Sequence, residues 1–138
     1  MAAMGETASM LLVVQILAAL AGLVHVYIWV METVRFSDPK VHRGVFKTDT
    51  ADLAAVKPWA ANQGWYNLFL AIGALLGAAL VRAEPAVGWT LVVTACGSMA
   101  LAALVLVATD RSMLAAAAKQ GLFPLLALVF SGVLAVAL

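Results

Sequence analysis

The feature that most constrains this chain is a run of 23 residues, Ser9 to Met31, without a single aspartate, glutamate, lysine or arginine. About 20 apolar residues in a helix are enough to cross the hydrocarbon core of a bilayer. The segment before it lacks the basic region of a secretory signal, so we expect a retained transmembrane helix. The whole chain is 65% hydrophobic and only 11% charged, against about 25% charged in soluble domains. We therefore expect an integral membrane protein.

Short polar turns divide the remaining apolar sequence into three further spans. The predicted transmembrane helices cover about residues 9–31, 59–81, 86–108 and 113–138, with a polar loop over 32–58. The fold predicted is all-α, a four-transmembrane-helix antiparallel bundle in one domain spanning residues 1–138. Within the loop, residues 48–56 are expected to form one or two turns of interfacial helix capped by Thr48 or Asp49. Pro58 is expected in the first turn of the second span.

The distribution of positive charge predicts the orientation. The 32–58 loop carries five lysines and arginines and the 109–120 segment carries two, whereas the 82–85 turn on the other side carries only Arg82. Since cytoplasmic loops are enriched in these residues, seven against one places the large loop in the cytoplasm and both termini outside.

Hydrogen-bonding side chains gather where the second span begins. Asn62, Gln63, Trp65, Tyr66 and Asn67 all fall within two helical turns. Lipid offers such groups no partners, so we expect them to face protein, ligand or water.

A matching polar stripe follows the first span. It consists of residues spaced three or four apart, which share one helix face: Gln15, Ala18, Gly22, His25, Trp29 and Glu32. Counting about 1.5 Å per residue from the cytoplasmic ends places His25 level with Tyr66 and Asn67, and Trp29 level with Asn62 and Gln63. We therefore predict a buried polar site in the cytoplasmic half of the bundle.

The side-chain chemistry suggests roles within this site. An imidazole and a carboxylate can exchange protons near neutral pH, so His25 and Glu32 are candidate catalytic residues for proton transfer. Tyr66, which would orient a polar group, is the third candidate catalytic residue. The candidate ligand-binding residues are Tyr27, Trp29, Asn62, Gln63, Trp65 and Asn67. Each has a structural alternative, because amides and histidines in membrane helices also hold neighbouring helices together.

These two polar segments carry a resemblance to a known family. His25-Val26-Tyr27-Ile28 followed by Glu32, and the stretch from Asn62 to Ala71 reading NQGWYNLFLA, resemble the motifs of a bacterial family of small integral membrane proteins, domain-of-unknown-function family 1304. The resemblance implies four spans, a bacterial inner-membrane location and no established activity. Trp65 departs from the family pattern, in which a smaller aliphatic residue is usual.

Three functions remain open at this stage. The favoured one is binding of a lipophilic small molecule, with an isomerase-type or hydratase-like acid/base enzyme as its catalytic form. A small proton-coupled transporter working as a dimer and a structural or assembly subunit are the alternatives. The partners expected are membrane lipids and the lipophilic molecule, with a homo-oligomer left open.

Other classes of function are disfavoured by composition. A net charge of +1 provides no basic surface for nucleic acid. Cys96 is the single cysteine and no zinc-type spacing is present, so no metal is expected. No cofactor is expected either, because His25 is the one histidine within a span and cannot ligate a haem in pairs.

Overall fold

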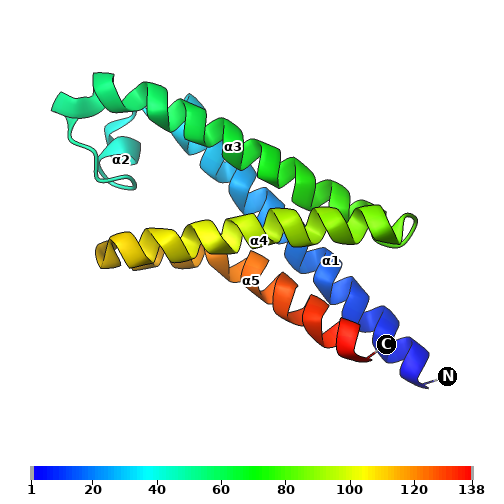
Figure 1. The fold of residues 1–138 in the computed structure, drawn as a ribbon. Helices are drawn as coiled ribbons and strands as arrows, with labels where there is room; N and C mark the ends of the chain where they lie inside the picture. The colour runs from blue at the N-terminus through cyan, green and yellow to red at the C-terminus, as the bar shows by residue number, and fades with distance from the viewer. Residues whose placement is uncertain (1, 138) are drawn as a thin grey trace.

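The computed structural model describes residues 2–137, and over these residues the chain is almost entirely helical, without a strand. The four long helices are α1 (Ala2–Trp29), α3 (Leu53–Leu80), α4 (Pro85–Thr109) and α5 (Leu114–Ala137) (Figure 1). The shorter elements are a π-helical turn η1 (Val30–Val34), the helix α2 (Pro39–His42), and the 3₁₀ turns η2 (Thr50–Asp52) and η3 (Arg111–Met113). The predicted all-α, four-helix architecture is confirmed.

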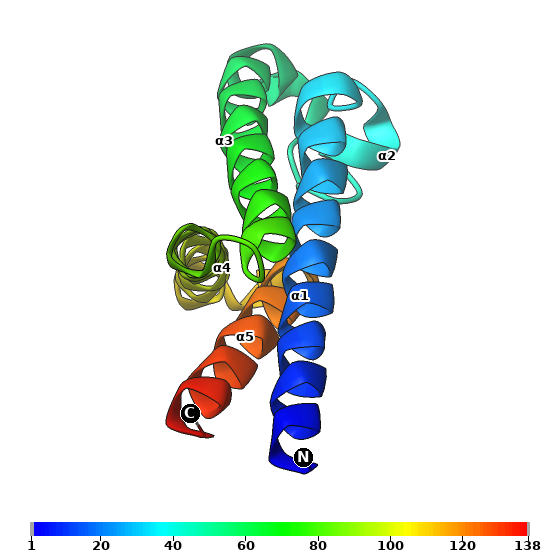
Figure 2. The ribbon, with the colours of Figure 1, turned by 90° about the vertical axis from the view of Figure 1, so that its right-hand side faces the viewer.

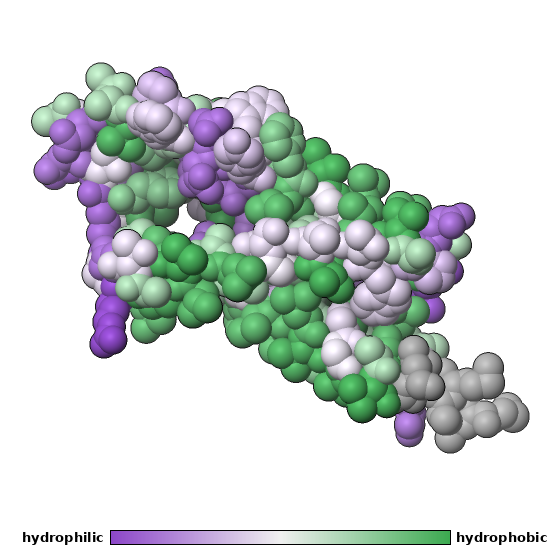
Figure 3. All heavy atoms as spheres, in the orientation of Figure 1, coloured by the Kyte–Doolittle hydropathy of each residue, from purple (hydrophilic) through white to green (hydrophobic). Residues whose placement is uncertain are grey.

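All four long helices meet the requirements for crossing a membrane. The stretches Gly5–Val34, Thr50–Leu80, Pro85–Thr109 and Arg111–Val136 are each long and apolar enough to do so. Apolar residues cover most of the helical surface, and hydrophilic residues gather toward the two ends of the molecule (Figure 3). This distribution matches a bilayer, whose apolar core is bounded on both sides by polar interfaces.

The helices form a ring in the order α1, α3, α4, α5. α1 packs against α3 and α5, and α4 packs against the same two, so α1 and α4 lie diagonally apart (Figures 1 and 2). The central core is built largely from small side chains: Val14, Ala18, Ala21, Ala74, Ala78, Val92, Ala95, Cys96, Met99 and Ala127. Small residues let helix backbones approach closely, which is the main source of attraction between helices in lipid.

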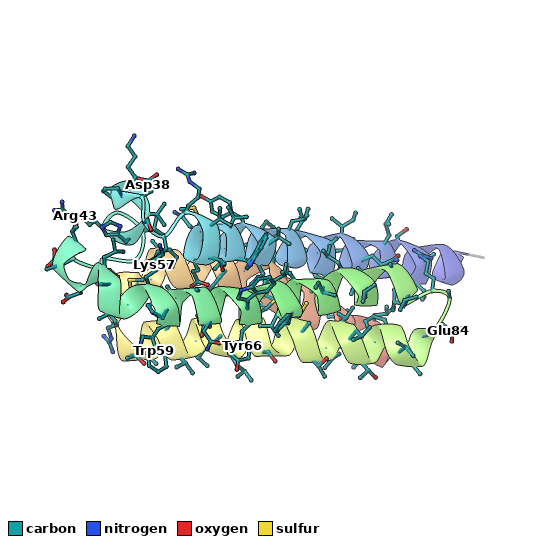
Figure 4. All side chains as sticks on the ribbon, turned by 90° about the horizontal axis from the view of Figure 1, so that it is seen from above. Asp38, Arg43, Lys57, Trp59, Tyr66 and Glu84 are labelled. Atoms are coloured by element: carbon teal, nitrogen blue, oxygen red, sulfur yellow. The ribbon has the colours of Figure 1, made fainter. Side chains whose placement is uncertain are left out.

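Residues 35–52 fold into a small structure at one end of the bundle, which we call the cap. Phe36, Val41 and His42 are buried in it, and the rings of Phe36 and Phe46 lie 5.5 Å apart. The His42 imidazole fixes the turn, since its Nδ1 bonds the carbonyl of Phe36 and its Nε2 bonds the hydroxyl of Thr50. The labelled side chains of Asp38, Arg43 and Lys57 lie at this end, with Glu84 at the other (Figure 4).

The cap also contacts the connection between α4 and α5. Lys47 donates hydrogen bonds to the backbone oxygen and the hydroxyl of Ser112, at 3.4 and 3.1 Å. The side chain and backbone N–H of Ser112 in turn bond Asp110, which lowers the pKa of that carboxyl. The two connections richest in lysine and arginine therefore share one side of the bundle, as the alternation of spans requires.

The structure corrects one local prediction. Residues 48–56 do not form a separate interfacial helix capped by Thr48 or Asp49. The 3₁₀ turn η2 instead leads directly into α3, and neither Asp49 nor Asp52 makes a side-chain capping bond. Pro58 consequently lies inside α3, not in its first turn. Proline cannot donate to the carbonyl four residues earlier, but Pro58 is exposed at the cap end, where water can reach that oxygen.

At the end opposite the cap, Gln15 links three elements. Its Nε2 donates to the carbonyl of Ala78 at 2.7 Å, and its Oε1 accepts from Arg82 Nε at 2.7 Å. Ala78 is among the last four residues of α3, whose carbonyls lack partners within the helix.

Replacing Gln15 with leucine should therefore lower the free energy of unfolding by about 1 kcal/mol, because the part-buried carbonyl of Ala78 and the exposed Arg82 side chain each lose a partner. Detergent-titrated unfolding followed by circular dichroism would measure the change. The same substitution at Gln63, which is exposed, is the matched control and should have little effect. Equal losses for both variants would contradict the capping role of Gln15.

Candidate functional site

A π-helical turn at the end of α1 places a carboxylate inside the bundle. In η1 the backbone N–H of Arg35 bonds the carbonyl of Val30 at 2.9 Å, five residues earlier, where an α-helix would use a spacing of four. Such turns shift the face on which the following side chains lie, and they occur frequently at functional sites. Here Met31 and Glu32 are buried, and the Glu32 side chain is only 8% exposed.

Glu32 meets Asn67 of α3 in the interior. Asn67 Nδ2 donates to Glu32 Oε2 at 2.7 Å, and Asn67 is itself buried. The antiparallel arrangement explains the contact, because helical side chains lean toward the amino terminus of their own helix. The Glu32 side chain therefore leans away from the cap and the Asn67 side chain leans toward it, so they meet between their backbones.

Gly64 permits this close approach of α3 to η1. A Cβ atom at Gly64 would overlap the hydroxyl oxygen of Thr33 and lie 3.1 Å from Glu32 Cβ. Glycine at this position therefore brings Asn67, one turn farther along α3, within reach of the carboxylate. Sequence reasoning missed the roles of both Thr33 and Gly64, although NQG in the second motif marked a glycine beside the amides.

Two further polar atoms near Glu32 have no partner. Among the described residues, Trp29 Nε1 and Thr33 Oγ1 are buried side-chain atoms without a hydrogen bond. Trp29 lies one turn before Glu32, and Thr33 follows it directly. An unmet buried polar atom costs about 1–3 kcal/mol, so two of them on residues that flank Glu32 in the sequence require an explanation.

Aromatic rings cover this region on the outer surface of the bundle. Trp29 and Trp65 have ring centroids 5.8 Å apart, Trp65 and Phe69 6.2 Å, and Phe69 and Tyr66 6.5 Å. We call these four residues the aromatic cluster. Trp29 is half-buried, whereas the other three are exposed. The cluster therefore links α1 to α3 through Trp29 and Trp65, and three of its four rings lie at the surface of the bundle.

His25 lies deeper in the bundle and apart from the pair. It is 2% exposed, and its Nδ1 bonds the carbonyl of Ala21 at 2.9 Å. Because a carbonyl only accepts, Nδ1 carries the proton and Nε2 is left as the basic nitrogen. No hydrogen bond to Nε2 occurs within residues 2–137. Seven residues separate His25 from Glu32, which is about 10 Å along the helix axis.

The remaining predicted residues lie outside the interior. Asn62 and Gln63 are exposed, as are the phenols Tyr27 and Tyr66. Tyr66 lies on the flank of α3 away from α1 (Figure 4). Of the nine residues proposed from sequence, the structure thus brings together Glu32, Asn67, Trp29 and Trp65, with His25 buried farther along α1.

The register between the two helices differs from the depth count. That count paired His25 with Asn67, whereas the structure pairs Glu32 with Asn67 and Thr33 with Gly64. The count took Glu32 and Trp59 as the helix ends. In the structure helical geometry continues to Val34, and α3 already begins at Leu53. Because Glu32, just past the end of α1, is level with Asn67, 14 residues into α3, the two helix ends are not level, and α3 extends about three turns beyond Val34 on the cap side. The pairing is therefore displaced by more than one turn from the prediction.

Cavities of substantial volume lie elsewhere. One of about 520 Å³ is lined by Gly5, Glu6, Ser9, Met10, Val13 and Phe130. Another of about 450 Å³, between α4 and α5, is lined by Trp89, Val93, Leu128, Ser131, Gly132, Leu134 and Ala135. None of the nine predicted site residues lines either cavity. Among the described residues there is also no group of three or more histidine, cysteine or acidic side chains placed to hold a metal.

The close fit at Gly64 can be tested by a substitution that adds a single methyl group. Gly64→Ala should push α3 away from η1, break the Asn67–Glu32 bond and lower the free energy of unfolding by about 1–3 kcal/mol. Detergent-titrated unfolding would measure this change in the free energy of unfolding. Gly73→Ala on the same helix is the control, because its Cβ would make only an ordinary contact, 3.4 Å from Ala95 Cβ. Similar stabilities for the two variants would contradict the tight packing at Gly64.

Four apolar helices with a buried carboxylate–amide pair define a multi-pass membrane protein. A comparison with protein families matches residues 19–131 to the family described as "Protein of unknown function (DUF1304)", and the chain belongs to this family. The match includes both polar motifs, the whole of α3 and α4, and parts of α1 and α5. Comparisons with curated proteins and with solved structures found no match.

Proposed function

We propose that this protein binds a lipophilic small molecule bearing one polar group, which is recognised by Glu32 and Asn67. The observation that carries the proposal is the carboxylate itself. Glu32 lies within a membrane-spanning helix and receives one amide hydrogen bond. Among the described residues the one salt bridge is the exposed Arg35–Asp38 pair, so no cation balances Glu32. Ionisable groups in this position are costly, and they usually mark a functional site.

The surroundings of the pair favour a mostly apolar ligand. Trp29, one turn before Glu32 on α1, packs against Trp65 of α3, and Trp65 and Phe69 are 46% and 58% exposed. Such rings can turn aside into the acyl chains and admit a molecule from the bilayer. Figure 3 also shows the surface hollowed between the cap and the nearby end of α4. A ligand entering sideways would place its polar group inside and leave its hydrocarbon part among aromatic and lipid chains.

Binding is favoured over acid/base catalysis by the spacing of the ionisable groups. A general acid and a general base must both reach the reacting atoms at hydrogen-bond distance. His25 and Glu32 are separated by about 10 Å along α1, and each is bonded to a different partner. An isomerase-type reaction that used both groups would require a large rearrangement of α1.

We also propose that the cap lies in the cytoplasm. The cap side carries seven of the eight lysines and arginines, in segments 32–58 and 109–120. The start of α1 and the end of α5 then lie together on the opposite side (Figure 1). With this orientation, the Glu32–Asn67 pair occupies the cytoplasmic half of the bilayer.

Native mass spectrometry of the protein extracted with its lipids tests the proposed function. The wild type should carry an additional small molecule beyond bulk phospholipid, and Glu32→Gln should lose it, because a neutral amide no longer offers a charged acceptor. Glu84→Gln, which changes an exposed carboxylate at the other end, should retain it. Absence of the molecule from the wild type, or equal amounts in all three proteins, would favour a purely structural or assembly role.

A further inference from the structure

We infer that the polar group of the bound molecule is a hydroxyl, an inference that rests on the proposed binding site. It follows from which hydrogen-bonding capacities the site leaves unused. Glu32 Oε2 is bonded to Asn67, whereas Oε1 accepts no hydrogen bond within residues 2–137. One strong acceptor is therefore left over, and it keeps some accessible surface, since it is not among the fully buried atoms without a partner.

The same site also contains hydrogen-bond donors without a partner. Trp29 Nε1 is a donor only, and Thr33 Oγ1 can donate or accept. Both atoms are buried without a partner. They belong to the turn that carries Glu32, and Thr33 Oγ1 lies against Gly64, one turn before Asn67. The unused acceptor and the unused donors thus share one turn of α1–η1 and the facing turn of α3.

A single hydroxyl matches this set. Its hydrogen can be donated to the carboxylate, and its oxygen can accept from the indole N–H or from the threonine. An ammonium group would neutralise Glu32 but cannot accept, so Trp29 Nε1 would stay unmet. An ether or ketone oxygen would satisfy Trp29 but leave the carboxylate without a donor. Water has the same capacities as an alcohol and is the competing occupant.

Three probes with the same eight-carbon chain separate these cases: octan-1-ol, octylamine and 1-methoxyoctane. Each is titrated into protein in nanodiscs with ¹⁵N-labelled tryptophan, and the indole N–H signals are followed by NMR. Trp29→Phe assigns the reporting signal. Trp59, which is 75% exposed at the cap end of α3, reports general partitioning of the probe into the bilayer.

We expect octan-1-ol to shift the Trp29 signal with saturation and to bind at least tenfold more tightly than either other probe. Glu32→Gln should weaken the binding of octan-1-ol at least tenfold, because the variant no longer has a charged acceptor for the hydroxyl. Tightest binding by octylamine or by the ether would overturn the hydroxyl assignment. A Trp29 shift no larger than that of Trp59 for every probe would overturn it too, since water or protein would then fill the site.

The proposed function fails separately from this inference. If native mass spectrometry detects a Glu32-dependent molecule while octan-1-ol shows no preference, the binding site stands and its hydroxyl specificity is wrong. If neither experiment depends on Glu32, both proposals are wrong.

Discussion

Replacing Asn67 with leucine is expected to lower the free energy of unfolding by about 2 kcal/mol. The substitution removes the one hydrogen bond that the Glu32 carboxylate receives, at 2.7 Å. It also puts an apolar side chain in place of the amide that the carboxylate contacts. Hydrogen bonds to charged groups contribute about 1.5–3 kcal/mol, and a buried carboxylate left without its hydrogen bond adds its own desolvation penalty. Unfolding in detergent titrations, followed by circular dichroism, would measure the loss. Asn62→Leu, at an exposed amide on the same helix, should have little effect.

A double variant distinguishes a site retained for binding from one retained for stability. Glu32→Met combined with Asn67→Leu replaces the pair with apolar side chains of similar size. Buried polar pairs can often be replaced in this way without loss of stability. If the pair serves ligand binding, the double variant should recover most of the stability lost by Asn67→Leu while still lacking the bound molecule. A double variant that is no more stable than the single one would indicate a structural role for the pair.

The architecture could be predicted because bilayers impose strict rules. Charge-free segments of about 20 residues identify spans, and short turns make neighbouring helices antiparallel. Helix ends were harder to place, since hydropathy marks only the part of a helix that lies in hydrocarbon. α1 accordingly begins at Ala2 and α3 at Leu53, several residues before the predicted starts at 9 and 59.

The structure has a polar contact between the two helices that the sequence singled out, but in a different register. Periodicity placed Trp29 and Glu32 on the face of α1 that meets α3, and this agrees with the positions of Glu32 and Asn67. No sequence pattern indicates that a helix will end in a π turn, and this turn extends the helix past Glu32. The count also assumed that the two helices end at the same level, whereas α3 begins about three turns beyond Val34 on the cap side.

Exposure of the two phenols could not have been deduced from polarity. Tyr66 was expected inside because lipid provides no hydrogen-bond partner, and Tyr27 was expected to bind a ligand, yet they are 56% and 61% exposed. A tyrosine is largely an aromatic ring, and its hydroxyl can reach the polar interface while the ring contacts acyl chains. Asn67 has no such apolar body, which explains why it is buried against Glu32 while its neighbour Tyr66 is not.

The close contact between α3 and α4 leads to the second large effect. Gly88, in the first turn of α4, lies directly against the end of α3. A Cβ atom there would overlap the backbone N and Cα of Val81 and lie 2.9 Å from the backbone carbon of Leu80. Backbone atoms cannot turn aside as a side chain can. Gly88→Ala should therefore force the two helices apart and lower the free energy of unfolding by about 3 kcal/mol or more.

A series of alanine substitutions makes this prediction testable even if Gly88→Ala fails to fold. Gly77→Ala should be intermediate, because its Cβ would lie 2.8 Å from the backbone nitrogen of Val92. Gly97→Ala, on the same helix as Gly88, has nothing within 4 Å of its Cβ and should be neutral or slightly stabilising, since alanine favours helix over glycine. Detergent-titrated unfolding and the yield of folded protein should follow the order Gly97, Gly77, Gly88. An equal loss at all three positions would mean that helix propensity, and not the fit between α3 and α4, determines their effect.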